Sequence, residues 1–167
     1  GLGQCAYDCF AAGDDPRTFY LWGAMGGAVP MGIGLAVAQP EKRVLVITGD
    51  GELLMGLGSL TAAAAEGLPN MAIAVIDNER YGETGQQQTV TGRGADLTAI
   101  AAASGFGTTK LVTEEADIDA GVDLCRNATG PVLVTFKVSA DPLPMALPPK
   151  DGAYLKSRFR EAVVGKI

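Results

Sequence analysis

Short runs of apolar, β-branched residues alternate along the chain with longer segments in which apolar and small residues recur at helical spacing. The short runs predict strands at residues 44–47, 71–76, 108–112 and 131–138. The longer segments predict helices at residues 53–66, 96–104, 113–127 and 151–164, with Asp96 at the start of the second and Gly67 just after the first. The polar, glycine-rich segment 81–94 predicts a long loop.

This alternation of strands and helices indicates the fold class. It favours an α/β fold with an open, mostly parallel, doubly wound sheet and helices on both faces. No internal repeat and no domain boundary is evident, so residues 1–167 are expected to form a single domain. Ligands of such sheets bind beyond the carboxyl ends of the strands, which places the expected site just after Ile47 and just after Ile76.

Composition removes several classes of function. The chain is 47% hydrophobic and 19% charged, which argues against disorder. Its formal net charge of −6 and the absence of a Lys/Arg cluster argue against nucleic-acid binding. The absence of histidine means that any His-dependent chemistry must come from another chain. The apolar stretch 24–38 is shorter than a membrane span, and the N-terminus shows no signal-peptide pattern, so we expect no membrane association.

The three cysteines also bear on the environment of the protein. Cys5, Cys9 and Cys125 are odd in number and irregularly spaced, so they do not form a recognisable disulfide framework. Cys5 and Cys9 could share a helix face, but two further zinc ligands would be needed. Ordinary free thiols in a reducing cytoplasm are the favoured interpretation.

Polar residues follow two of the predicted strands where each strand ends. Asp50 lies between Gly49 and Gly51 after the first strand, and Asn78 follows the second strand 28 positions later. A helix and a strand separate them, so a βαβ unit would bring both to the same sheet edge. A carboxylate and an amide oxygen there could share Mg²⁺, which completes its octahedron with phosphate and water. Gly-Asp-Gly alone is also a common turn, so the spacing to Asn78 is what favours a metal site.

This pattern resembles the fingerprint of the thiamine diphosphate-dependent enzymes, in which Gly-Asp-Gly is followed by some 25–30 residues and then Asn. The resemblance implies the diphosphate-binding domain of that family, with thiamine diphosphate and Mg²⁺ as cofactors. It implies that Asp50 and Asn78 bind Mg²⁺ through their side chains and Arg80 through its backbone carbonyl. The turn at Gly49 and the amides of Gly51 and Glu52 would hold the diphosphate. Because Glu52 stands where relatives often have a small or hydroxyl residue, its carboxylate would have to point away.

Two further segments extend the resemblance. Gly23-Ala24-Met25-Gly26 is similar to the Gly-x-Met-Gly stretch of the acetolactate synthase and decarboxylase branch. There, the Gly carbonyl accepts a hydrogen bond from the 4′-amino group, and the Met supports the bent cofactor. The alternative is that Met25 fills the core of a helix. The segment 81–86, with Tyr81, Gly82 and Thr84, resembles sulfopyruvate and phosphonopyruvate decarboxylases, although a flexible loop is the alternative and the His of phosphonopyruvate decarboxylases is absent.

The resemblance implies a 2-oxoacid decarboxylase that releases CO₂ and forms an aldehyde. The carboxylate that activates the cofactor is, in this family, a Glu of the pyrimidine-binding domain, for which 167 residues leave no room. No catalytic residue is therefore assigned to this chain. We expect a β-type subunit in a hetero-oligomer that holds at least two copies of each chain.

Three alternatives stay open at this point. A carboligase subunit would use the same cofactor, and a non-catalytic module could bind it in a regulatory role. A dinucleotide- or nucleotide-binding domain is disfavoured because neither Gly-x-Gly-x-x-Gly nor a Walker A pattern occurs.

Overall fold

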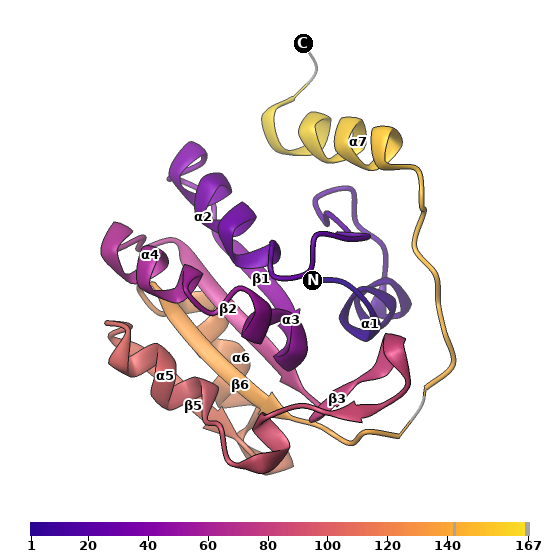
Figure 1. The fold of residues 1–167 in the computed structure, drawn as a ribbon. Coiled ribbons are helices and arrows are strands. Elements are labelled where there is room, and N and C mark those ends of the chain that lie inside the picture. The colour runs from indigo at the N-terminus through magenta and orange to yellow at the C-terminus, as the bar shows by residue number, and fades with distance from the viewer. Residues whose placement is uncertain (142, 166–167) are drawn as a thin grey trace.

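A computed structural model describes residues 1–141 and 143–165 of the chain (Figure 1). Its centre is a sheet of four parallel strands in the order β1-β2-β6-β5. The bounds of these strands are Val44–Gly49 for β1, Met71–Asp77 for β2, Val132–Lys137 for β6 and Thr108–Val112 for β5. The open, parallel sheet confirms the fold class expected from the sequence.

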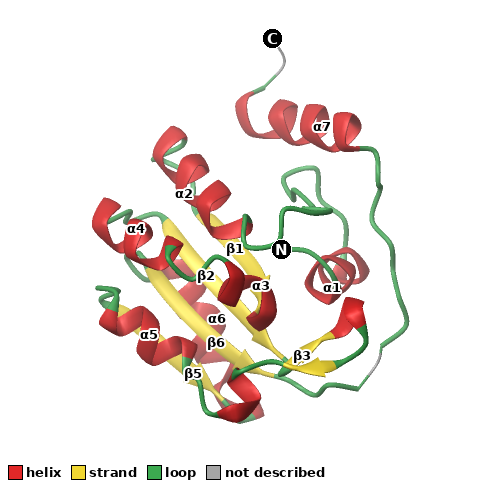
Figure 2. Cartoon of the chain, viewed as in Figure 1, coloured by secondary structure: helices red, strands yellow, loops and turns green. Residues whose placement is uncertain are grey.

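Helices cover both faces of the sheet, as Figure 2 shows. One face carries α2 (Ala28–Ala38), α3 (Asp50–Met55), α4 (Ser59–Glu66) and α5 (Leu97–Ala103), and the other carries α6 (Ile118–Asn127). The remaining helices are α1 (Gln4–Ala12) and α7 (Gly152–Val164). A two-stranded hairpin, β3 (Arg80–Tyr81) and β4 (Gln87–Gln88), and 3₁₀ turns η1 (Gly82–Thr84), η2 (Thr91–Arg93) and η3 (Glu115–Asp117) complete the described elements.

Strand β2 shows why this sequence forms a two-sided layer. Met71, Ile73 and Val75 belong to the core formed with α2, α4 and α5, whereas Ala72 and Ala74 pack in the core beside α6. Because side chains alternate between the two faces of a strand, an uninterrupted apolar run can fill both cores.

Helix ends agree with the sequence in two places. The carboxylate of Asp96 accepts a hydrogen bond from the Ala99 amide at 3.0 Å, which caps α5. Gly67 ends α4 in the left-handed conformation, with a φ of 58°.

The predicted single helix at 53–66 is wrong. Helix α3 already begins at Asp50 and ends at Met55, and a separate helix, α4, begins at Ser59. The reason is a close approach of two backbones, since a Cβ at Gly56 would lie 2.3 Å from the carbonyl oxygen of Gly26. The loop expected at 81–94 also contains the β3–β4 hairpin, and α2 was not among the predicted helices.

Candidate functional site

The carboxyl ends of β1 and β2 lie side by side, because Gly49 and Ile76 are register partners in this parallel pair. Asp50, the first residue of α3, and Asn78, the first residue after β2, therefore meet at the same sheet edge. Asp50 is 2% exposed, and Asn78 is partly buried. The structure thus brings together the two strand ends that carry Asp50 and Asn78, and their shared metal site stays a prediction.

The carboxylate of Asp50 is held by neutral groups. One of its oxygens accepts hydrogen bonds from the hydroxyls of Thr89 at 2.5 Å and Thr91 at 3.2 Å. Burial raises the pKa of Asp50, the Thr89 hydroxyl opposes that shift, and the nearby charge of Asp77 adds to it. Within the described chain, no Lys or Arg side chain bonds to Asp50. Buried charges are normally paired or coordinate a metal, so this carboxylate fits a cation ligand.

Behind Asp50 lies a second buried carboxylate, Asp77, to which the sequence pattern assigned no role. Asp77 is 3% exposed and accepts hydrogen bonds from the Thr91 hydroxyl at 2.8 Å, the Glu79 amide at 3.1 Å and the Lys137 ammonium at 3.1 Å. Lys137 also bonds to the Glu79 carboxylate. Burial alone would lower the pKa of Lys137, but the hydrogen bonds to Glu79 and Asp77 outweigh it and raise that pKa. The signal available in the sequence was a Lys at the end of a mostly apolar strand, and the structure places it in register with Asp77.

The turn after β2 is tightly constrained. The side-chain oxygen of Asn78 accepts a hydrogen bond from the Arg80 amide at 3.0 Å, and the Glu79 carbonyl accepts one from the Thr89 amide at 2.9 Å. Glu79 has a φ of 60°, which costs a non-glycine residue about 1–3 kcal/mol and is concentrated at functional sites. The turn places the Asn78 side chain and the Arg80 backbone within one short segment.

At the start of α3, Gly51 has no side chain and the Glu52 side chain points into the interior, so both residues offer their backbones to the site. A Cβ at Gly51 would lie 2.5 Å from a ring carbon of Tyr81, so this ring rests directly on Gly51. The Glu52 carboxylate accepts hydrogen bonds from the Thr48 hydroxyl at 2.9 Å and the Ala28 amide at 3.3 Å. It is turned into the interior at the start of α2, which satisfies the condition that it point away from a bound anion.

The segment before α2 is held against α3. Gly26 packs on Gly56, and Ala24 has a φ of 52°, a second strained non-glycine residue at a predicted cofactor contact. Met25 lies outside any helix and is 36% exposed, so the alternative that it fills a helix core is wrong. An added Cβ at Gly23 would meet no atom within 4 Å, which leaves the backbone there accessible.

Gly82 and Thr84 lie in the exposed turn η1. The Thr84 hydroxyl donates to the side-chain oxygen of Gln87, the first residue of β4, at 2.9 Å. The structure therefore brings Tyr81 to the strand ends but leaves these two residues at the tip of the hairpin, where their cofactor contacts stay a prediction.

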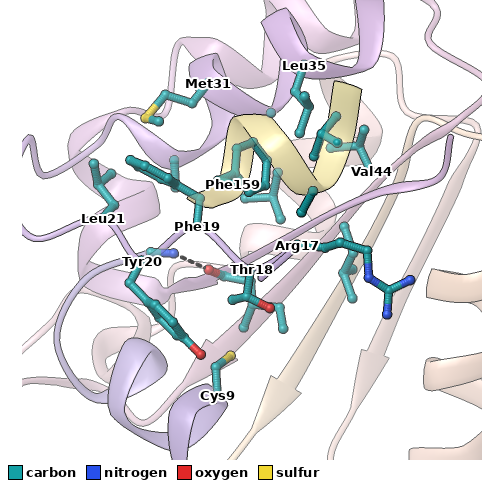
Figure 3. A pocket seen from close by; sticks show the side chains of 18 of the residues that line it. Cys9, Arg17, Thr18, Phe19, Tyr20, Leu21, Met31, Leu35, Val44 and Phe159 are labelled. Carbon is teal, nitrogen blue, oxygen red and sulfur yellow. Dashed lines mark hydrogen bonds between the residues drawn. The ribbon is translucent and has the colours of Figure 1, made fainter. Parts of the chain in front are cut away.

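A cavity of about 610 Å³ lies elsewhere, between α7, α2 and the outer edge of β1 (Figure 3). Its walls include Phe19, Leu35 and Phe159. Its lining contains none of the residues predicted to bind metal or cofactor. The chemistry therefore places the candidate site at the strand ends and not in this cavity.

The donor set at the strand ends suits magnesium. Among residues 1–141 and 143–165, no group of three or more His, Cys, Asp or Glu side chains could hold an ion by itself. Mg²⁺ is commonly bound through one or two carboxylates together with substrate phosphates and water. Asp50 beside Asn78 fits that mode of binding.

These features define an α/β domain whose ligand site lies at the carboxyl ends of adjacent parallel strands. Residues 2–136 match the family model of the C-terminal TPP-binding domain of thiamine pyrophosphate enzymes, and the chain belongs to this family. The matched region contains every residue that we predicted to bind cofactor or metal. Family membership confirms thiamine diphosphate as the cofactor, whereas the individual contacts stay predictions.

Similar proteins include the sulfopyruvate decarboxylase subunit beta of Methanothermobacter thermautotrophicus, which is 44% identical over 63% of this chain and 56% of its own length. A phosphonopyruvate decarboxylase of Streptomyces viridochromogenes is 33% identical over 96% of this chain and 40% of its own length. The chain thus spans about half the length of these relatives. A solved structure of a protein from Mycobacterium smegmatis shares the fold, with a TM-score of 0.59 over 73% of this chain and 24% of that one, at 22% identity.

No helix within the described residues is both long enough and apolar enough to cross a membrane.

Proposed function

We propose that this chain is the diphosphate-binding subunit of a two-chain 2-oxoacid decarboxylase that depends on thiamine diphosphate and Mg²⁺. The observation that carries the proposal is the buried Asp50 carboxylate, which lies at the same sheet edge as Asn78 and whose side-chain hydrogen-bond partners among the described residues are the neutral hydroxyls of Thr89 and Thr91. The names of the similar proteins support decarboxylation of a 2-oxoacid with an anionic substituent, such as sulfopyruvate.

Each part of the site has a role in this proposal. Asp50, Asn78 and the Arg80 carbonyl hold Mg²⁺, and the backbone from Gly49 to Glu52 holds the diphosphate. Residues 23–25 orient the pyrimidine side of the cofactor, while Tyr81, Gly82 and Thr84 border it. When bound, thiamine diphosphate supplies the nucleophile and the electron sink of the reaction.

The partner in this proposal is a pyrimidine-binding subunit that supplies the activating Glu. The naming of one relative as subunit beta supports a second chain. We propose a hetero-oligomer with at least two copies of each chain, and a cytoplasmic location that agrees with the free thiols of Cys5, Cys9 and Cys125.

Substitution of Asp50 tests the metal assignment. In the assembled enzyme, thiamine diphosphate is titrated by calorimetry with and without Mg²⁺, for the wild type, Asp50→Asn and the control Asp119→Asn, which changes an exposed carboxylate on α6. We expect Mg²⁺-dependent binding in the wild type and the control, and its loss in Asp50→Asn, because the substitution removes the formal charge of the ligand. Equal cofactor affinity with and without Mg²⁺ in the wild type would refute the metal site.

The product identifies the reaction. Decarboxylation alone predicts one CO₂ and one aldehyde for each 2-oxoacid consumed in a panel that includes sulfopyruvate. The Gly-x-Met-Gly match at residues 23–26 is shared by the acetolactate synthase and decarboxylase branch, so a carboligase is the second candidate. A carboligase would instead join two substrates and release less than one equivalent of aldehyde.

A further inference from the structure

A network of hydrogen bonds behind Asp50 connects three carboxylates, those of Asp50, Asp77 and Glu79, to the ammonium of Lys137. Thr91 lies between Asp50 and Asp77, and Lys137 binds both Asp77 and Glu79. We propose that Thr91 and Lys137 are positioning residues of the metal site. Lys137 pairs with Asp77 and Glu79, and Thr91 links Asp77 to the Asp50 carboxylate, so that Asp50 remains the carboxylate available to the metal. This inference rests on the proposed function.

The number of available hydroxyl hydrogens shows that the hydrogen bonds of this network depend on one another. Four oxygen–oxygen contacts link Asp50, Thr89, Thr91 and Asp77, at 2.5, 2.8, 2.8 and 3.2 Å. Each hydroxyl can donate a single hydrogen bond, so two hydroxyl hydrogens serve four contacts. Asp50 and Asp77 therefore compete for the hydrogen of Thr91. Thr91 lies nearer to Asp77, at 2.8 Å, than to Asp50, at 3.2 Å, and the ammonium of Lys137 offsets part of the negative charge of Asp77. Thr91 can then hold Asp50 both directly and through Thr89, whose hydroxyl bonds to Asp50 at 2.5 Å.

The ammonium of Lys137 also stabilises the turn at residues 78–80, which carries the other predicted metal-binding residues. Asp77 accepts the amide hydrogen of Glu79, and Lys137 binds the side chain of Glu79. Glu79 is the left-handed residue between Asn78 and Arg80, the two other predicted metal-binding residues. Lys137 thus supports that turn through two contacts, and its side chain is only 28% exposed.

Lys110 offers a matched control. It forms an ion pair with Asp117 at 3.2 Å and is 29% exposed, but it lies on β5 outside the hydrogen-bond chain. The test compares Lys137→Met, Lys137→Arg and Lys110→Met with Thr91→Val and Thr91→Ser. For each assembled enzyme, the Mg²⁺ dissociation constant is measured by calorimetry at saturating thiamine diphosphate, and the unfolding midpoint is measured in urea.

We expect Thr91→Val and Lys137→Met each to weaken Mg²⁺ binding about 10–100-fold, which is typical for outer partners of metal ligands. Thr91→Ser and Lys137→Arg should restore most of the affinity, and Lys110→Met should leave it unchanged. In the double variant of Thr91→Val and Lys137→Met, the loss should be smaller than the product of the two single losses, because both act through one chain.

Two results would overturn the inference. Removal of a nearby positive charge tightens cation binding when the effect is purely electrostatic, so tighter Mg²⁺ binding in Lys137→Met would contradict positioning. Lower stability with unchanged Mg²⁺ affinity in both Thr91→Val and Lys137→Met would show a structural role only. Failure of the proposed function itself is distinguishable, because the wild type would then show no Mg²⁺-dependent cofactor binding.

Discussion

Gly51 lies under the ring of Tyr81, and the space between them excludes even a methyl group. Gly51→Ala should therefore displace the ring and destabilise the protein by about 1–3 kcal/mol, as overpacking usually does. The displacement would also disturb the β3–β4 hairpin and weaken cofactor binding. Urea unfolding and cofactor titration measure the two effects.

The compensating substitution is the control for this interpretation. Tyr81→Ala removes the ring, so the double variant Gly51→Ala/Tyr81→Ala should recover most of the stability lost by Gly51→Ala alone. Additive losses in the double variant would show that the two residues act separately and that the ring contact is not the cause.

At the scale of elements, the contact between Gly26 and Gly56 holds the predicted pyrimidine-side segment against the end of α3. Gly56→Ala would place a Cβ 2.3 Å from the Gly26 carbonyl oxygen. We expect a loss of about 1–3 kcal/mol in stability and weaker cofactor binding, because residues 23–25 would be pushed away.

Gly58 provides a matched control two residues along. An added Cβ there would meet no atom within 4 Å, and its φ of −59° suits alanine. Gly58→Ala should therefore be neutral or stabilise the protein by about 0.4–1 kcal/mol. If both glycine substitutions had the same effect on urea unfolding, the close approach at Gly56 would not explain its cost.

Elements differ in how far the sequence could predict them. The buried strands were recognisable because their apolar runs must fill two cores, and the spacing of Asp50 and Asn78 was recognisable because parallel strands share an edge. The break at Gly56 could not be predicted, since it depends on Gly26, a residue distant in the chain. The hydrogen bonds that link Thr91, Asp77 and Lys137 could not be predicted for the same reason, because these residues come from three separate segments.

At the scale of the whole molecule, α7 is tied to the N-terminal region by an ion pair. Arg158 binds the carboxylate of Asp14 at 2.6 Å, and this hydrogen bond holds the pKa of Asp14 below its ordinary value of 3.8. A carboxylate with a lowered pKa in the folded state stabilises the protein above the ordinary value, and the effect is lost as the pH falls through the lowered pKa. Docking of α7 should therefore weaken only below pH 3.8.

The single tryptophan can report this change. Its indole nitrogen donates to the Pro149 carbonyl just before α7, at 2.7 Å. We expect Trp22 fluorescence to change between pH 4 and pH 2 in the wild type, and to change less over that range in Asp14→Asn, which lacks the titrating carboxylate. Identical fluorescence–pH curves for the two proteins would contradict a role of this ion pair in docking α7.

The proposed split site makes a prediction about the isolated chain. Met25 and Met55 are 36% and 65% exposed at the rim where the Gly26–Gly56 contact lies, so a partner could cover them. Without a partner, the pyrimidine ring would lack its activating carboxylate, and such acid–base assistance is typically worth about 10²–10⁴ in rate. The isolated chain with thiamine diphosphate, Mg²⁺ and 2-oxoacids should release CO₂ at a rate lower by at least that factor than the assembled enzyme. Adding the pyrimidine-binding subunit should restore turnover and protect both methionines from oxidation. Full turnover by the isolated chain would refute the split site, and unchanged oxidation of Met25 and Met55 in an active complex would place the subunit interface elsewhere.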